Sequence, residues 1–188
     1  MKKELIKNGI HVGLILLLAI ISTYYIYYKF QNDRETDFNS ESLDVIYHDQ
    51  TKDKIDITKV IPVTDSVGLS SNAYSLTIKN NLTIGVNYTI KIVDDKEKIK
   101  EDECGESSIP KDNIRISIKV GKGTNNIYTL SELEDGVLSS NVIDALKKEN
   151  IVIRTWITKD TTLVSGSNMH YHGKIQVIEN DSIIAINK

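Results

Sequence analysis

Cysteine, proline, tryptophan and phenylalanine are scarce in this chain. Its 188 residues include one cysteine, two prolines, one tryptophan and two phenylalanines. A single cysteine, Cys104, excludes a disulfide within the chain. A folded domain must therefore be held together by its hydrophobic core, and a domain of about 140 residues is large enough to bury one.

The chain also has no excess of positive charge. The net charge is −3 at pH 7, but residues 1–29 contain four lysines and one glutamate, so this segment carries +3 and the remainder carries −6. Because an acidic domain repels phosphate backbones, we expect no nucleic-acid partner. The apolar fraction of 40% and the charged fraction of 26% are typical of a folded chain and not of a disordered one.

Charged side chains are missing altogether between Asn8 and Tyr28. Residues 9–28 predict a transmembrane helix, because a helix of this length rises about 30 Å, the thickness of the hydrocarbon core. Tyrosines cluster at its far end, where such rings favour the membrane interface. Lysines precede the segment and acidic residues follow it. The positive-inside rule therefore places the N-terminus in the cytoplasm and residues from about Gln31 onward outside.

A cleavable signal peptide is the alternative for this segment, since a basic start and a short apolar run also fit export. Cleavage after Ser22 would suit the run, but no A-x-A pattern ends it and bulky tyrosines follow. We therefore expect an uncleaved signal-anchor over residues 1–30. A polar stalk over 31–42 and an extracytoplasmic domain over 43–188 complete the predicted organisation.

Alternation of apolar and polar residues dominates the segment 43–188 and predicts half-buried strands. The clearest run is Ile114–Val120, and similar runs begin near residues 55, 74, 86, 151 and 171. Turn signals separate them at 65–68, 80–81, 121–123 and 165–168. About seven or eight short strands with one-sided polarity predict an all-β domain, an antiparallel β-sandwich of Ig-like or jelly-roll-like form. Its predicted core includes Tyr74, Leu76, Ile78, Tyr88, Ile90, Ile116, Ile118, Ile153 and Val177.

Two segments depart from the alternation. Residues 140–150 have apolar side chains at helical spacing, at Val142, Ile143 and Leu146, and predict the one helix of the domain. Residues 130–138 predict an irregular connection with a helical turn, since Asp135-Gly136 is a favourable turn pair.

His170 and His172 are the first candidates for a metal site, because residues two apart on a strand project from the same face. A zinc site needs three or four ligands, and only His48, with Asp49 beside it, offers another imidazole outside the apolar segment. The alternative is that both histidines lie on the polar outer face of a strand whose inner face carries Tyr171, Ile175 and Val177. We favour that alternative and expect no metal ligands.

Seven carboxylates crowd residues 94–106, which raises the question of calcium. The D-x-[DN]-x-[DN]-G pattern is absent and lysines interleave, so we expect a solvated hinge or loop. Cys104 lies in this acidic stretch, where neighbouring negative charge disfavours the thiolate that a nucleophile needs.

Sortases are anchored, outward-facing β-proteins that use Cys, His and Arg, and His48, Cys104 and Arg154 are the corresponding residue types here. The T-L-x-T-C nucleophile motif and its spacing to the arginine are missing, so a sortase-like transpeptidase is a remote alternative.

The stretch Gly121–Thr124 lacks the Lys-Ser/Thr pair of a phosphate loop and predicts a hairpin. Trp156 is expected to be a packing residue. No catalytic residue and no cofactor is therefore predicted.

The segment AYSLTIKNNLTIGVNYTIKI, residues 73–92, resembles part of the camelysin/TasA-like surface proteins of Gram-positive bacteria. The strands IRTWI at 153–157 and GKIQV at 173–177 fit the same layout, and the resemblance extends over residues 43–178. It implies a sandwich behind an N-terminal export segment, and for some members assembly into matrix fibres.

These observations together predict a non-enzymatic module at the cell surface that acts through protein contacts, in adhesion, matrix or envelope assembly. Its expected partners are the lipid bilayer, through residues 9–28, and other proteins, either copies of itself or unrelated chains. The alternative is an anchored accessory subunit of a secretion or cell-wall complex.

Overall fold

The computed structural model describes residues 17–18, 20–24, 36–39, 42–49, 51–102 and 108–184. The chain forms two units, Met1–Glu35 and Thr36–Lys188. Within the first, residues 17, 18 and 20–24 are helical, and most of the predicted membrane span lies outside the described residues. Among the residues that are described, no helix has the length and apolar character needed to cross a membrane.

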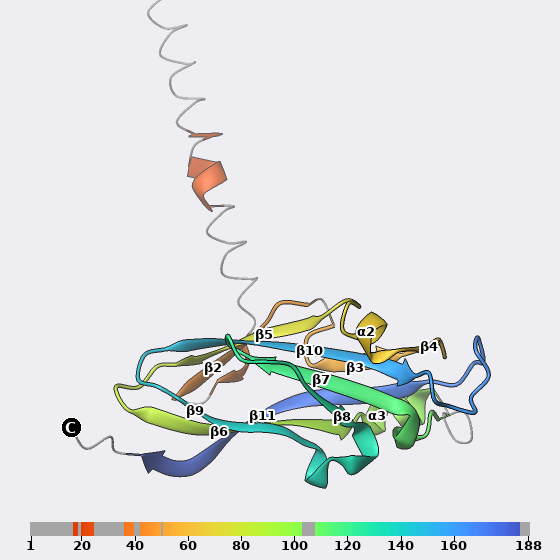
Figure 1. Cartoon of the computed structure of the whole chain (residues 1–188). Helices are drawn as coiled ribbons and strands as arrows, with labels where there is room; N and C mark the ends of the chain where they lie inside the picture. The colour runs from red at the N-terminus through yellow and green to blue at the C-terminus, as the bar shows by residue number, and fades with distance from the viewer. Residues whose placement is uncertain are drawn as a thin grey trace, which may run out of the picture. The chain divides into compact units, whose positions relative to one another are not determined.

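Two β-sheets form the second unit (Figure 1). The larger sheet has the order β1-β2-β5-β10-β7-β8, with β4 paired to β10. Its strands are β1 (Thr36–Asn39), β2 (Leu43–Tyr47), β4 (Pro62–Val63), β5 (Tyr74–Asn80), β7 (Ile114–Val120), β8 (Asn126–Thr129) and β10 (Lys148–Thr158). Strand β1 therefore lies within the segment that the sequence suggested as a stalk.

The smaller sheet has the order β3-β11-β6-β9. Its strands are β3 (Lys54–Ile57), β6 (Gly85–Asp94), β9 (Val137–Ile143) and β11 (Tyr171–Ile184). Every pairing of named strands is antiparallel except that of β4 with β10. The short helical segments are α2 (Asp65–Gly68), α3 (Lys96–Glu101), η2 (Lys111–Asn113), η3 (Leu130–Glu132) and η4 (Glu134–Gly136). The predicted all-β, mostly antiparallel sandwich is confirmed.

Aliphatic side chains from both sheets fill the space between them. Ile116 on β7 and Ile153 on β10 are fully buried, as are Ile78 on β5 and Ile90 on β6. All of the predicted core residues are buried except Tyr74, which is half-buried and packs against the core. Alternation placed these side chains correctly because each strand turns one face inward.

The predicted helix over residues 140–150 is wrong. Strand β9 ends at Ile143, a turn follows, and β10 begins at Lys148. Within the turn, Leu146 adopts a φ of 57° and its side chain is exposed, while Ile143 is buried in the core. Three apolar residues in so short a segment fit a strand and a turn as well as they fit a helix.

The predicted connection at 130–138 is confirmed in its irregular form, with η3 and η4 in sequence and positive φ at both Asp135 and Gly136. The predicted hairpin at residues 121–123 is confirmed as well, since β7 and β8 pair across it.

Asn80 is a buried polar residue at the point where the chain leaves one sheet for the other. Strands β5 and β6 belong to different sheets, so the residues between them form a crossing and not a hairpin. The Asn80 side-chain Nδ2 donates to the carbonyls of Ile84, at 2.7 Å, and Ile143, at 3.1 Å. The Asp144 carbonyl, at 3.0 Å, shares one of the two amide protons, and the Asn80 Oδ1 accepts from the Leu82 N–H. Asn80 thus joins this crossing to another one, between β9 and β10.

Trp156 is a buried packing residue, as predicted, but it lies on the outer face of β10, under α2. Its indole Nε1 donates to Asp65 Oδ1 at 3.0 Å. Gly68 of α2 lies so close that a methyl group added there would be 2.2 Å from the indole ring. The glycine is therefore required by the close approach of α2 to the sheet.

Replacing Ile116 by Ala tests the core. We expect Ile116→Ala to lower the free energy of unfolding by about 2–5 kcal/mol, because it removes three buried carbons and leaves a cavity. The matched control is Val142→Ala, at a side chain that is 44% exposed, where the change should stay below about 0.5 kcal/mol. Urea unfolding measures both; equal destabilisation by the two substitutions would contradict the proposed core.

Candidate functional site

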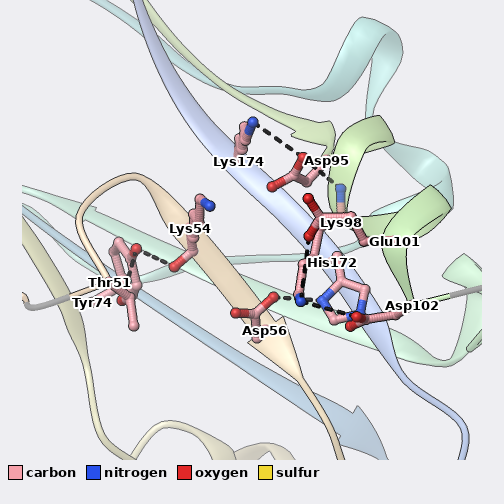
Figure 2. A network of polar contacts seen from close by, with 10 residues as sticks. All are labelled: Thr51, Lys54, Asp56, Tyr74, Asp95, Lys98, Glu101, Asp102, His172 and Lys174. Atoms are coloured by element: carbon pink, nitrogen blue, oxygen red, sulfur yellow. Dashed lines mark hydrogen bonds and ion pairs between the residues drawn. The ribbon is translucent and has the colours of Figure 1, made fainter.

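The densest cluster of charged and titratable side chains lies where α3 packs beside β3 and β11 (Figure 2). Helix α3 begins after Asp95, whose side chain accepts a hydrogen bond from the Lys98 N–H at 3.2 Å. Glu97 lies in its first turn, and Lys98 and Lys100 lie in its last turn. This distribution complements the helix dipole. The predicted solvated hinge or loop is therefore a short helix at Lys96–Glu101, whose side chains are nonetheless exposed or half-buried, and residues 103–107 lie outside the description.

His172 is the most buried titratable side chain of this cluster. Its residue is 2% exposed, its Nδ1 lies 2.6 Å from Asp56 Oδ1 on β3, and its Nε2 lies 3.1 Å from Asp102 Oδ2 at the end of α3. The first contact is a hydrogen bond, whereas the second is a close approach without hydrogen-bond geometry. The ring of His170 lies 5.1 Å away, centroid to centroid.

His172 lies on the polar outer face of β11, as predicted, but it is buried there. The residue does point away from Tyr171 and the core, but the end of α3 covers it. Alternation along β11 cannot reveal that cover, because it comes from a helix that is distant in the sequence. The charges on α3 gave the only available signal, since a carboxylate there can approach an imidazole on the strand.

A second link joins α3 to β11. The Lys174 ammonium lies 3.1 Å from Asp95 Oδ1, and the Asp95 side chain is only 3% exposed. Burial by itself raises the pKa of the Asp95 carboxyl, but the hydrogen bonds from Lys174 and from the Lys98 N–H outweigh it and hold that pKa below its ordinary value. The same hydrogen bond raises the pKa of Lys174.

Asp102 is held by a third link, within α3. Lys98 Nζ donates to Asp102 Oδ1 at 2.9 Å, and this bond lowers the pKa of the Asp102 carboxyl, to which the two neighbouring histidines also contribute. The carboxylate that faces His172 is thus kept ionised by the helix that carries it. These contacts form a clamp, which we define as Asp56, Asp95, Lys98, Asp102, His172 and Lys174 (Figure 2).

The contacts of the clamp hold α3 against β11, which is a structural role. Both ring nitrogens of His172 face carboxylates, and no described hydroxyl or thiol is recorded as its hydrogen-bond partner. Nucleophilic catalysis needs such a partner. In the described ranges, no group of three or more His, Cys, Asp or Glu side chains is arranged to hold a metal ion. The absence of a metal and of catalysis stays a prediction.

His48 is not brought to the other histidines by any recorded contact. It follows β2 in the larger sheet, and its Nε2 lies 2.7 Å from Thr77 Oγ1, which donates to Asn150 Oδ1. Asp49 accepts a hydrogen bond from the Ser75 N–H at 2.8 Å. Arg154 donates to the Ser71 carbonyl, and Cys104 lies outside the described residues. The two described residues of a sortase-like site, His48 and Arg154, therefore contact different partners.

Two hollows, of about 360 and 250 Å³, share Lys111 and Tyr171 in their linings, and Ile99 of α3 lines the smaller one. Lys111 Nζ donates to Asp94 Oδ2 at 2.8 Å, and the Tyr171 hydroxyl lies 3.3 Å from Asp94 Oδ1. Burial and the nearby Asp94 carboxylate raise the pKa of Tyr171, so its hydroxyl stays protonated at neutral pH. Lys111 and Tyr171 thus both bond to Asp94 at these hollows.

Comparison with known proteins adds no relative. No family model matches the chain, and no curated protein or solved structure matches it. The function must therefore be argued from the chain's own geometry.

The link between Asp95 and Lys174 predicts a pH-dependent stability. We expect Asp95→Asn to lower the free energy of unfolding by about 1 kcal/mol near pH 6, because Asn keeps the helix cap but loses the charge. Since the folded pKa is depressed, the contribution of Asp95 is complete above its ordinary pKa of about 3.9 and is lost as the pH falls through the folded value.

Urea unfolding of both proteins between about pH 6 and pH 2.5 measures this effect. The difference in midpoint should shrink as the pH falls. The control is Glu97→Gln, at a side chain that is 88% exposed and 3.9 Å from Lys174, where we expect no measurable difference. A difference for Asp95→Asn that stays constant over the whole range would show that the charge is not its cause.

Proposed function

We propose that this chain is a membrane-anchored, extracytoplasmic β-sandwich module that acts without catalysis, through protein contacts at the cell surface. The observation that carries the proposal is the engagement of the candidate reactive groups in structural contacts. His172, the most buried of them, faces Asp56 and Asp102, and His48 contacts Thr77. An enzyme needs convergent groups directed at an open cleft. Among the described residues, such groups are directed at one another.

The sheet edges supply what a contact module needs. In the described part of the chain, the larger sheet ends at β1 and β8, and the smaller sheet ends at β3 and β9. A strand at a sheet edge carries backbone N–H and C=O groups that can pair with a strand from another chain. The resemblance of residues 73–92 to camelysin/TasA-like proteins supports the same role, in adhesion, matrix or envelope assembly.

The anchor is supported by composition and by the exposed side chains of the first unit. Leu17, Leu18, Ile20 and Ile21 are each more than half exposed on a helical segment without charge. Apolar side chains on a helix are stable when lipid or another protein covers them.

Protease accessibility tests the topology. Protease added to intact cells should digest the second unit, because the charge asymmetry around residues 9–28 places it outside. A tag fused before Met1 serves as the control and should stay protected until the cells are opened. Protection of the second unit on cells whose other surface proteins are digested would contradict this orientation.

Amine-directed cross-linking of the full chain on intact cells tests the contact function itself. Self-assembly should give a ladder of homo-oligomers, whereas an accessory subunit of a secretion or cell-wall complex should give one band with an unrelated protein. A strictly monomeric pattern, together with no co-purifying protein in mild detergent, would refute the proposed function in either form.

A further inference from the structure

The imidazole of His172 lies between two carboxylates and is almost completely buried (Figure 2). Its Nδ1 is hydrogen-bonded to Asp56 Oδ1 at 2.6 Å, and its Nε2 lies 3.1 Å from Asp102 Oδ2. The His172 side chain is 3% exposed, and its Nε2 has no hydrogen-bond partner among the described residues. One buried ring therefore faces two carboxylate oxygens, one at each nitrogen.

The number of protons on this ring decides whether both contacts attract. A neutral imidazole carries one N–H and an imidazolium carries two, while an ionised carboxylate can only accept. The short hydrogen bond to Asp56 needs the proton of a neutral ring on Nδ1, so the Nε2 lone pair faces the Asp102 carboxylate and is repelled by it. In the charged ring an N–H faces each carboxylate, and both contacts attract.

The charged groups that face His172 come from three elements. Asp56 faces it from β3 and Asp102 faces it from α3, where Lys98 is bonded to Asp102. The hydrogen bond from Lys98 lowers the pKa of the Asp102 carboxyl, so Asp102 stays ionised wherever histidine changes charge. On β11 itself, the ring of His170 lies 5.1 Å away and changes charge over the same range of pH.

The two ends of α3 are held to β11 in different ways. At the beginning of the helix, Asp95 is paired with Lys174, and its N–H donates to the His172 carbonyl at 3.0 Å. Burial opposes the ionisation of Asp95, but its hydrogen bonds outweigh burial and lower its pKa, and the same pairing raises the pKa of Lys174. This pair therefore keeps its charges between about pH 5 and pH 8. At the other end, the contact of Asp102 depends on the charge of a histidine.

We propose that His172 is a pH-sensitive lock for α3, whose charged ring holds the Asp102 end of the helix on β11 and whose neutral ring releases it. The contribution of the lock is complete at the acidic end of the histidine range and is lost as the pH rises through that range. The Asp95 end stays attached. The inference goes beyond the proposed contact function and does not depend on it, since all of these contacts lie within the second unit.

Release of one end is enough to unfold this helix. It has six residues, and an isolated helix shorter than about 12 residues is marginal in water. Without α3, the outer faces of β3 and β11 around His172 become accessible to solvent. The surface that this end of the domain presents therefore changes with pH.

Hydrogen exchange of the full chain in mild detergent tests the lock. The reporters are the Ile99 and Asp102 amides, which donate to the Asp95 and Lys98 carbonyls. Each rate is divided by that of an unstructured peptide at the same pH, which removes the pH dependence of exchange itself. From about pH 5.5 to about pH 8, their protection should fall about tenfold, as expected for the loss of one hydrogen bond to a charged group. The Ile175 amide of β11 is the internal control and should keep its protection.

Three variants identify the responsible groups. His172→Gln should remove the change with pH, because an amide side chain does not titrate, and His170→Gln, the matched control on the same strand, should retain it. Asp102→Asn should also remove the change, because its amide can donate to the neutral ring and accept from the charged one. The Asp102 side chain is 36% exposed, so this variant provides the test if His172→Gln does not fold.

The unaltered chain and the variants can each contradict the lock. Protection of the α3 amides that is constant or rises with pH in the unaltered chain would overturn the proposal. So would a fall with pH that survives His172→Gln or Asp102→Asn, or one that disappears in His170→Gln.

Discussion

The side-chain amide of Asn80 holds together two of the places where the chain crosses between its sheets. One crossing joins β5 to β6, the other joins β9 to β10, and the amide bonds to carbonyls of both. Without disulfides, the sandwich relies on the contact between its two aliphatic inner faces. That contact requires the sheets to stay in register at their ends. A buried amide with all of these bonds satisfied supplies the register, because leaving any of the carbonyls unpaired would cost free energy.

The outer faces of both sheets are covered locally by short helices, each fixed by an aspartate. Helix α2 covers Trp156 on the larger sheet through Asp65, and α3 covers His172 on the smaller sheet, where Asp102 faces the ring. In both cases alternation along the strand directs the side chain toward solvent, but the helix covers it. The clamp thereby makes a segment rich in carboxylates part of the folded unit, and the ion pairs offset repulsion that would otherwise favour an open loop.

Alternation predicted the strands and most of the core because a strand with one buried face must repeat every two residues. Alternation failed where contacts with residues distant in the sequence determined the local structure or the burial of a side chain. Residues 140–150 matched a helical period by three side chains only, and in the turn the Leu146 N–H donates to the Leu82 carbonyl of the crossing between β5 and β6. The burial of His172 depended on α3, and the pairing of Asn80 depended on β9. Both involve partners more than sixty residues away in the sequence, and local patterns carry no record of them.

Trp156 is the only tryptophan of the chain, and it lies between β10 and α2 with Gly68 against its ring. Its fluorescence therefore reports on a single place, the docking of α2 on the larger sheet. If α2 detached while the sandwich stayed folded, the indole would enter water and its emission would shift to longer wavelength before the circular dichroism of the strands changed. The chain thus carries a built-in optical probe that separates the loosening of one end of the domain from its global unfolding.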